Sequence, residues 1–295
     1  MYSLTSNTTG TYNTAIGYGT LVSNTTGSFN SAFGHGALLY NATGVNNSAF
    51  GYFALFYNTA NNNSAFGINS LRNNTTGTNN TAIGRDCLLG NTIGIDNTAI
   101  GLNSMYNNTT GSYNTAVGRN ALQNNTTGAN NVAVGTSALS ANTIGTHNVA
   151  VGFNALSSNT TGGLNTALGG NSLYSNTIGI YSVAVGYSAL YSNTTGNYNN
   201  AFGFYALRNN TGGQRNNAFG IEALKANTFG DENSAFGSAA LLANTTGNRN
   251  CAFGKYALVN NVVGSNNSAF GKDALSSNTT NNNSAFGYKA LYANT

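Results

Sequence analysis

The chain contains no proline, no tryptophan and very little charge, since only 5% of its 295 residues are Asp, Glu, Lys or Arg. An ordinary soluble domain carries about 25% charged residues. Without proline the chain is not a collagen, and without an apolar run of about 18 residues it is expected to have no membrane insertion. It does contain 38 glycines, 17 tyrosines and 15 phenylalanines. So many aromatic residues argue against a disordered tail.

The few charges are spread along the chain rather than gathered in one place. Ten Lys and Arg residues against six Asp and Glu residues give a net charge of +4. A protein that binds nucleic acid usually concentrates its basic residues in a patch or stripe, so no nucleic acid partner is expected. Weak charge repulsion favours association of the chain with itself.

One motif recurs from end to end: an alanine, a large apolar residue and a glycine, ending first at Gly17 and last at Gly287. The seventeen copies are spaced by 17 residues, except for two steps of 16 that end at Gly67 and Gly287. Both short copies lack the loop glycine of the others. The missing residue is therefore predicted to fall in a turn, where its loss leaves the register of the core unchanged.

Positions within a copy are counted from the motif glycine as position 0. Position −2 is always Ala, position −4 is Asn except at Ser182, and position +4 is Leu except at Met105. All 16 charged residues fall at −6, −5, +1, +2 or +5. These positions are predicted to face water, and the others to form core, turns or contact surfaces.

The period predicts an all-β fold. Helical-hairpin repeats need about 33 to 47 residues, whereas the apolar segments here are short, rich in β-branched and aromatic residues, and bounded by Asn, Thr and Gly, which is typical of strands. We predict a parallel β-solenoid, or β-roll, of about seventeen 17-residue coils with two short strands per coil, forming one repeat domain over 1–295. Coils would stack at about 4.8 Å and join their apolar faces into one core.

The large residues at −1 and +4 are predicted to fill this core, each worth roughly 1.5–3 kcal/mol when buried. Ala at −2 and Gly at 0 share the opposite face of the strand. Their small size indicates a close approach, either of the far wall of a thin coil or of a neighbouring subunit. The predicted structural core includes Ala15, Ile16, Gly17, Leu21, Phe33, Leu38, Val134, Leu139, Phe236 and Leu241.

Asparagines recur at −4 and −10, where stacked amides can form hydrogen-bonded ladders. The predicted ladder residues are Asn13, Asn30, Asn24, Asn91 and Asn142. Some asparagines also head N-x-[ST] sequons and are candidate glycosylation sites, namely Asn7, Asn24, Asn41, Asn108, Asn125 and Asn244. Asn91 and Asn142 persist where the sequon is broken, which favours the ladder interpretation.

No catalytic, cofactor-binding or metal-binding residues are predicted, and an enzyme is not expected. His35 and His147 would lie about seven coils, or roughly 30 Å, apart. Asp231 and Glu232 are adjacent on a single turn, but a calcium-binding β-roll needs acids in successive turns. Cys87 and Cys251 would lie about 48 Å apart, so they are interpreted as small fillers without an intrachain disulfide, and an interchain bridge stays open.

Exposed tyrosines could contact sugars or other fibres, or could stack between coils, because tyrosine joins an apolar ring to a polar tip. The candidates are Tyr18, Tyr52, Tyr113, Tyr187, Tyr198, Tyr205 and Tyr256. The threonine-rich turns suggest an ice-binding solenoid as a further alternative, although the second Thr is replaced in several copies, for example by Ile144 and Phe229.

The cassette N-[ST]-A-[FIV]-G-x-x-A-L begins with Asn13-Thr14-Ala15-Ile16-Gly17 and Asn30-Ser31-Ala32-Phe33-Gly34. It resembles the head repeats of YadA-like trimeric autotransporter adhesins, and more closely the N-T-A-x-G-x-x-A-L and N-T-T-G arrays of tail-fibre-like surface proteins from bacteria and phages. The resemblance covers the whole chain. It implies a left-handed parallel β-roll, often trimeric, in an adhesin or a fibre shaft.

The expected function is therefore that of a non-enzymatic structural fibre, extracellular on a cell surface or on a virion surface. The expected partner is the chain itself, end to end or side by side. An adhesin shaft that recognises cell-surface glycans is the alternative. Neither end shows a polar cap or a signal peptide, and uncapped strand edges template further pairing. The chain is thus expected to be a segment of a longer protein or a subunit that joins end to end.

Overall fold

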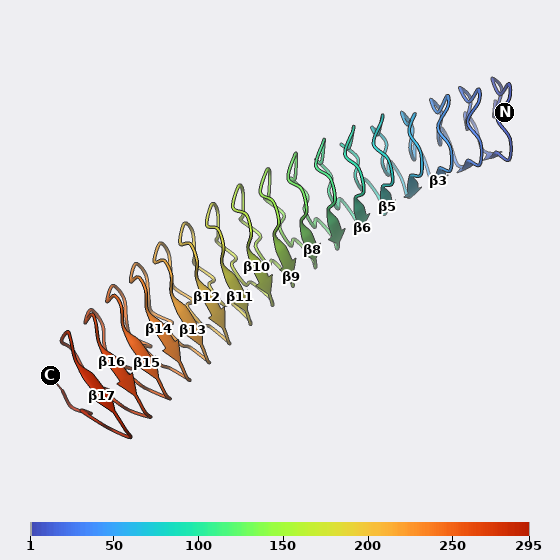
Figure 1. Cartoon of the computed structure of the whole chain (residues 1–295). Helices are drawn as coiled ribbons and strands as arrows, with labels where there is room; N and C mark the ends of the chain where they lie inside the picture. Colours follow the sequence, from blue (N-terminus) through green and yellow to red (C-terminus); the bar gives the residue numbers. More distant parts are fainter. Residues whose placement is uncertain (1, 295) are drawn as a thin grey trace. The chain divides into compact units, whose positions relative to one another are not determined.

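A computed structural model describes residues 2–294, and they form an all-β parallel solenoid with one coil per repeat (Figure 1). The chain divides into two compact units, Met1–His147 and Asn148–Thr295, and each is described separately. Both units are built from the same coil, and the described residues contain no helix. The predicted fold class is confirmed.

Each coil carries one strand of three residues. In the first unit the strands are β1 (Thr14–Ile16), β2 (Ser31–Phe33), β3 (Ser48–Phe50), β4 (Ser64–Phe66), β5 (Thr81–Ile83), β6 (Thr98–Ile100), β7 (Thr115–Val117) and β8 (Val132–Val134). In the second unit they are β9 (Val149–Val151), β10 (Thr166–Leu168), β11 (Val183–Val185), β12 (Asn200–Phe202), β13 (Asn217–Phe219), β14 (Ser234–Phe236), β15 (Cys251–Phe253), β16 (Ser268–Phe270) and β17 (Ser284–Phe286).

Within each unit every strand pairs in parallel with the next one along the chain, and alanine always lies beside alanine. Ala15 pairs with Ala32 in the first unit, and Ala235 pairs with Ala252 in the second. The two 16-residue steps keep this register, since Ala49 pairs with Ala65 and Ala269 pairs with Ala285. The missing residue lies in the turn before β4, where Asn58 Nδ2 donates to Ala60 O at 2.8 Å. The prediction that the deletion falls in a turn is confirmed.

The expectation of a second strand in each coil was wrong. The segment around position +4 does pair with the next coil through its backbone: Leu21 N–H donates to Ala37 O at 3.2 Å, and Ser23 N–H to Leu39 O at 3.0 Å. Leu21, however, has a φ of +48°, which lies in the left-handed region rather than the β region. The segment is therefore a hydrogen-bonded ladder that is not in strand conformation.

Left-handed backbone recurs at −5, +2 and +4 of the coil, as at Tyr113, Asn120 and Leu122. A β-branched residue is a strong outlier at positive φ, and no Ile, Val or Thr occurs at any of these three positions. This conformation explains why +4 is Leu or Met in every copy. It also explains why Ile and Val appear instead at −1, inside the strand.

The interior of the coil is thin and is filled by small side chains and one leucine. Leu38, at +4, and Ala32, at −2, are fully buried. The far wall approaches the alanine closely, because Ser104 Oγ at +3 donates to Ala116 O in the next coil at 3.1 Å. Between the two alternatives left open by the sequence, the structure shows the far wall of the same molecule beside the alanine face.

The prediction that the large residues at −1 belong to the core was wrong. Ile16 is 58% exposed, and Phe33, Val134 and Phe236 are half-buried on the outward face of their strands. Because a strand alternates its side chains between two faces, burial of Ala at −2 forces −1 outward. Among the other predicted core residues, Leu21, Leu38, Leu139 and Leu241 are fully buried, whereas Ala15 and Gly17, in the first coil, are half-buried.

The motif glycine is required by contact between coils. Gly169 has a φ of +128°, and a Cβ placed on it would lie 2.7 Å from the backbone O of Gly186 in the next coil. Any side chain there would overlap backbone that cannot move away, because it belongs to the same hydrogen-bonded stack.

Candidate functional site

Buried asparagines at −10 form the first ladder. Asn24 Nδ2 donates to Asn7 Oδ1 in the preceding coil at 2.8 Å and to Gly27 O in its own turn at 3.0 Å. Asn91 and Asn142 do the same toward the asparagines of their preceding coils, at 2.7 and 2.8 Å. Each amide therefore closes its own turn and ties that turn to its neighbour.

The second ladder lies at −4. Asn30 donates its backbone N–H and its Nδ2 to Asn13 Oδ1, at 2.9 and 3.1 Å, and its Nδ2 also donates to Gly44 O at 2.8 Å. Ser182 interrupts the row without breaking the contact, because Asn199 N–H donates to Ser182 Oγ at 3.3 Å. The predicted ladders are present, and they lie inside the molecule as structural elements.

The candidate glycosylation sites belong to the first ladder, so the interpretation of these residues as glycan acceptors was wrong for the folded chain. Asn7 is half-buried, and the other five are fully buried with their Nδ2 groups donating to carbonyl oxygens. A glycan on Nδ2 would remove these hydrogen bonds and has no space inside the coil. The six asparagines that belong to the ladder and are not glycan acceptors in the folded chain are Asn7, Asn24, Asn41, Asn108, Asn125 and Asn244.

The outward side of the strands forms a surface that we call the strand face, made of the side chains at −3 and −1. In the second unit six phenylalanines lie along it as one stack, with ring centroids 4.5–5.0 Å apart and planes within 7° of one another. They are Phe202, Phe219, Phe236, Phe253, Phe270 and Phe286. No charged residue occurs at −3 or −1 in any copy.

The predicted tyrosine surface is divided among several rows. Tyr18 and Tyr52 stack on either side of His35, with centroids 5.2 and 5.1 Å away. Tyr198 stacks on Tyr181 at 5.0 Å, and Tyr187 on Phe204 at 5.9 Å.

The other three predicted contact tyrosines, Tyr113, Tyr205 and Tyr256, pack against cations or face water. Arg208 lies over the ring of Tyr205 at 4.8 Å, and Lys255 over that of Tyr256 at 4.8 Å, while Tyr113 is 56% exposed. In the stacked rows that contain Tyr18, Tyr52, Tyr187 and Tyr198, contact along the coils covers ring faces. A sugar that binds by stacking needs a free ring face, so these rows are better suited to stabilising the surface.

The threonines of the turns have their hydroxyls engaged at −9. Thr25 Oγ1 donates to Ala42 O at 3.0 Å, and Thr109 Oγ1 to Thr126 O at 3.0 Å, each in the next coil. The exposed neighbouring position is interrupted by large apolar residues such as Ile144 and Phe229. The turns thus do not present a regular hydroxyl array.

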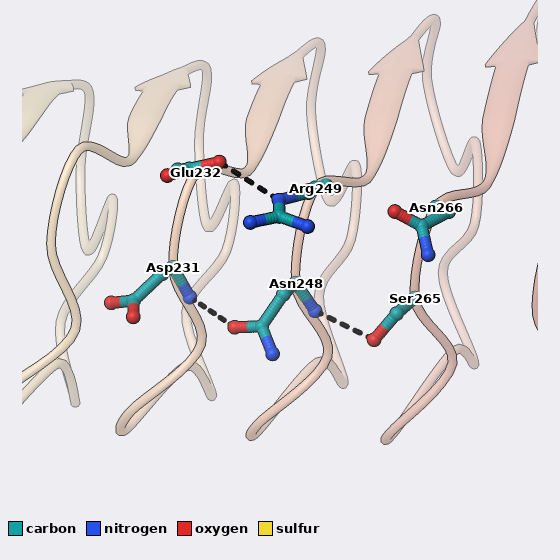
Figure 2. A pocket seen from close by; sticks show the side chains of 6 residues that line it. All are labelled: Asp231, Glu232, Asn248, Arg249, Ser265 and Asn266. Carbon is teal, nitrogen blue, oxygen red and sulfur yellow. Dashed lines mark hydrogen bonds and ion pairs between the residues drawn. The ribbon is translucent and has the colours of Figure 1, made fainter.

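A polar groove lies on the second unit, across three successive coils (Figure 2). It encloses about 300 Å³ and is lined by the residues at −6 and −5, namely Asp231, Glu232, Asn248, Arg249, Ser265 and Asn266. Hydrogen bonds between coils order its floor: Asp231 N–H donates to Asn248 Oδ1 at 2.7 Å, and Asn248 N–H to Ser265 Oγ at 3.0 Å.

One side of the groove is an ion-pair network. Glu232 accepts from Arg249 Nε at 3.0 Å and lies 3.7 Å from Arg215 Nη1. The sequence indicates only that Asp231 and Glu232 are neighbours. The groove could not be predicted from that pair, because it forms from the same two positions of three coils that carry different residues.

The two cysteines differ in environment, and both are free thiols. Cys87 at +3 is buried, and burial raises the pKa of its thiol to about 12. Cys251 at −3 is half-buried on the strand face, and burial raises its pKa as well. Both thiols are therefore neutral at pH 7 and weakly nucleophilic.

Comparison with known protein families finds none that matches this chain, and a search of curated proteins finds no significant relative. Within residues 2–294 no group of three His, Cys, Asp or Glu residues is placed to hold a metal ion. The same part of the chain contains no helix with the length and apolar character of a membrane span.

Proposed function

We propose that this protein is a non-enzymatic structural protein that forms a fibre at a cell surface or virion surface by self-association of its coils. The observation that carries the proposal is the composition of the strand face. Position −1 points outward, yet it is Phe, Ile, Val or Leu in all seventeen copies.

Other outward positions behave differently. At −5 the same chain accepts Tyr113, Asn130 and Arg215, and at +1 it accepts Tyr18, Arg85 and Lys255. Positions −5 and +1 thus accept charged, amide and aromatic side chains, whereas position −1 accepts only large apolar ones. An exposed apolar stripe of this kind marks an interaction surface. The partner proposed for it is a second copy of the chain, because another solenoid of the same sequence matches its axial period.

The backbone supports the same proposal. Every coil uses its carbonyl and N–H groups to pair with its neighbours, as Gly34 N–H does with Ile16 O at 2.9 Å. Such a stack resists bending and adds coils without changing its cross-section. The resemblance of the cassette to repeats in fibre and adhesin shafts is consistent with this function.

Electron microscopy of the purified chain tests the proposal. Self-association predicts elongated filaments or bundles whose diffraction shows a strong repeat of about 4.8 Å along the axis. Isolated single particles at every concentration tested would contradict it.

A further inference from the structure

The polar groove is lined by hydrogen-bonding side chains that have no role in the proposed self-association through the strand face. Figure 2 shows its six side chains on three neighbouring coils. The three coils span about 10 Å along the axis at the usual spacing of paired strands. Its volume of about 300 Å³ lies at the lower end of ligand sites. The ligand class is therefore a small one.

Charge within the groove is balanced. Glu232 is ion-paired with Arg249, which lines the groove, and with Arg215 beside it, whereas the Asp231 carboxylate accepts from Gln214 N–H in the preceding coil. With Arg215 counted, the two carboxylates and the two guanidinium groups cancel, so the groove has no excess of charge to favour an anion or a cation. Calcium would need six to eight oxygen ligands, and Glu232 is already occupied by two arginines.

The surface of the groove carries hydrogen-bond donors and acceptors that have no partner within residues 2–294. Among the described residues no hydrogen-bond partner is found for Asp231 Oδ2, for Asn248 Nδ2 or for the side-chain amide of Asn266. A carboxylate oxygen only accepts, while a primary amide both donates and accepts. The hydroxyls of a sugar ring can match all of these groups, because each hydroxyl both donates and accepts.

The free atoms are held in place before any ligand arrives. Asp231 Oδ1 accepts the backbone N–H of Gln214 at 2.7 Å, and Asn248 Oδ1 accepts that of Asp231 at 2.7 Å. These bonds restrict the rotation of the carboxylate and the amide, so Asp231 Oδ2 and Asn248 Nδ2 lose less freedom on binding than unbonded side chains would. Such preorganisation lowers the entropic cost of holding a ligand.

We propose that this groove binds a neutral sugar of one or two pyranose rings through hydrogen bonds to Asp231, Asn248 and Asn266. The sugar site is thus the groove at −6 and −5 and not the stacked tyrosine rows. It is separate from the strand face at −3 and −1, so sugar binding and self-association can fail independently.

The test is ligand-observed NMR on the whole chain with glucose, galactose, mannose and their β-linked disaccharides, followed by titration of the sugar that binds. Asn266→Gly removes the lining amide and keeps the left-handed backbone of Asn266 (φ +58°). Asp231→Asn keeps an oxygen for Gln214 N–H. Asn130→Gly makes the same change at −5 in the first unit, where φ is also +58°, and is the matched control.

The proposal predicts saturation transfer to at least one neutral sugar. It also predicts an affinity about three- to tenfold weaker for Asn266→Gly, which removes a neutral hydrogen-bonding group, and at least about tenfold weaker for Asp231→Asn, which removes a charged one. Asn130→Gly should bind within about twofold of the unmodified chain. Absence of binding to every sugar would overturn the proposal, and so would equal binding by the groove variants. Preference for glucuronate, glucosamine or Ca²⁺ over the neutral sugars would also overturn it.

Discussion

Asn47 donates its backbone N–H and its side-chain Nδ2 to the same atom, Oδ1 of Asn30, at 3.0 and 3.1 Å. The two residues occupy position −4 of successive coils and are fully buried. Asn47 Nδ2 also donates to Ala60 O at 2.8 Å. One amide thus joins three coils, and a charged side chain could not replace it, because like charges would face each other at every step of the stack.

The first prediction concerns this amide. Asn47→Asp removes both Nδ2 hydrogen bonds and leaves a carboxylate buried against Asn30 Oδ1 and Ala60 O. We expect a loss of at least about 3 kcal/mol in unfolding free energy, as for an unpaired buried charge. Asn46→Asp, at the adjacent exposed position, loses only the exposed hydrogen bond from Asn46 Nδ2 to Asn62 Oδ1 at 3.2 Å, and should change it by less than about 1 kcal/mol. Denaturant unfolding followed by circular dichroism compares the two, and equal effects would contradict the ladder's role.

The second prediction concerns the leucine at +4, whose backbone is in the left-handed region. Leu139 is buried with a φ of +51°, so Leu139→Ile adds a β-branched residue where the backbone cannot accept one. We expect it to cost about 2 kcal/mol or more, whereas Leu139→Met should cost less than about 1.5 kcal/mol, in line with Met105 at the same position. Thermal unfolding compares the two variants. Equal stability of Leu139→Ile and Leu139→Met would contradict the prediction.

Adjacent glycines give the third prediction. Gly169→Ala places a Cβ 2.7 Å from Gly186 O at a φ of +128°, whereas Gly170→Ala places one no closer than 3.4 Å, to the ring of Tyr187. The first change should destabilise the second unit by well over about 1 kcal/mol, and the second should be neutral or slightly stabilising. Unfolding midpoints of the two variants provide the measurement, and the reverse order would be inconsistent with the coil contact.

The fourth prediction is a pH dependence. Burial raises the pKa of Cys87 from 9.0 to about 12, so the unfolded chain loses this proton before the folded chain does. The stability associated with the neutral thiol is fully present below pH 9 and declines as the pH rises from 9 toward 12. Relative to Cys87→Ala, the unmodified chain should lose about 1.4 kcal/mol per pH unit in that window. The same slope in both chains would disprove this assignment.

The coil, its period and its register were predictable because one pattern is repeated in every coil. The ladders and the buried Leu at +4 followed from the same repetition. Which face of the strand lies inside could not be predicted in this way. The alternation of side chains along a strand separates two faces but does not indicate which of them is enclosed. Large residues usually lie inside, but here the wall that carries Ser104 lies too close to Ala116 for anything larger than alanine.

Two signals in the sequence carry that information. Position +3 is also always small, so both walls of the coil are made of small residues and the space between them is narrow. The absence of β-branched residues at −5, +2 and +4 indicates left-handed backbone and therefore a single strand per coil. The groove has no such signal, because Asp231, Asn248 and Ser265 form it only when three different coils are stacked.

Sedimentation velocity measures whether the strand face holds copies of the chain together. The double variant Phe236→Thr with Phe253→Thr keeps strand-forming residues and removes two rings from the stack, while Tyr187→Thr removes an exposed ring from another row as the control. We expect the unmodified chain and the control to sediment as assemblies, and the double variant to stay folded but to sediment at or near its single-chain mass of about 30.3 kDa. Assembly of the double variant to the same size as the unmodified chain would contradict it.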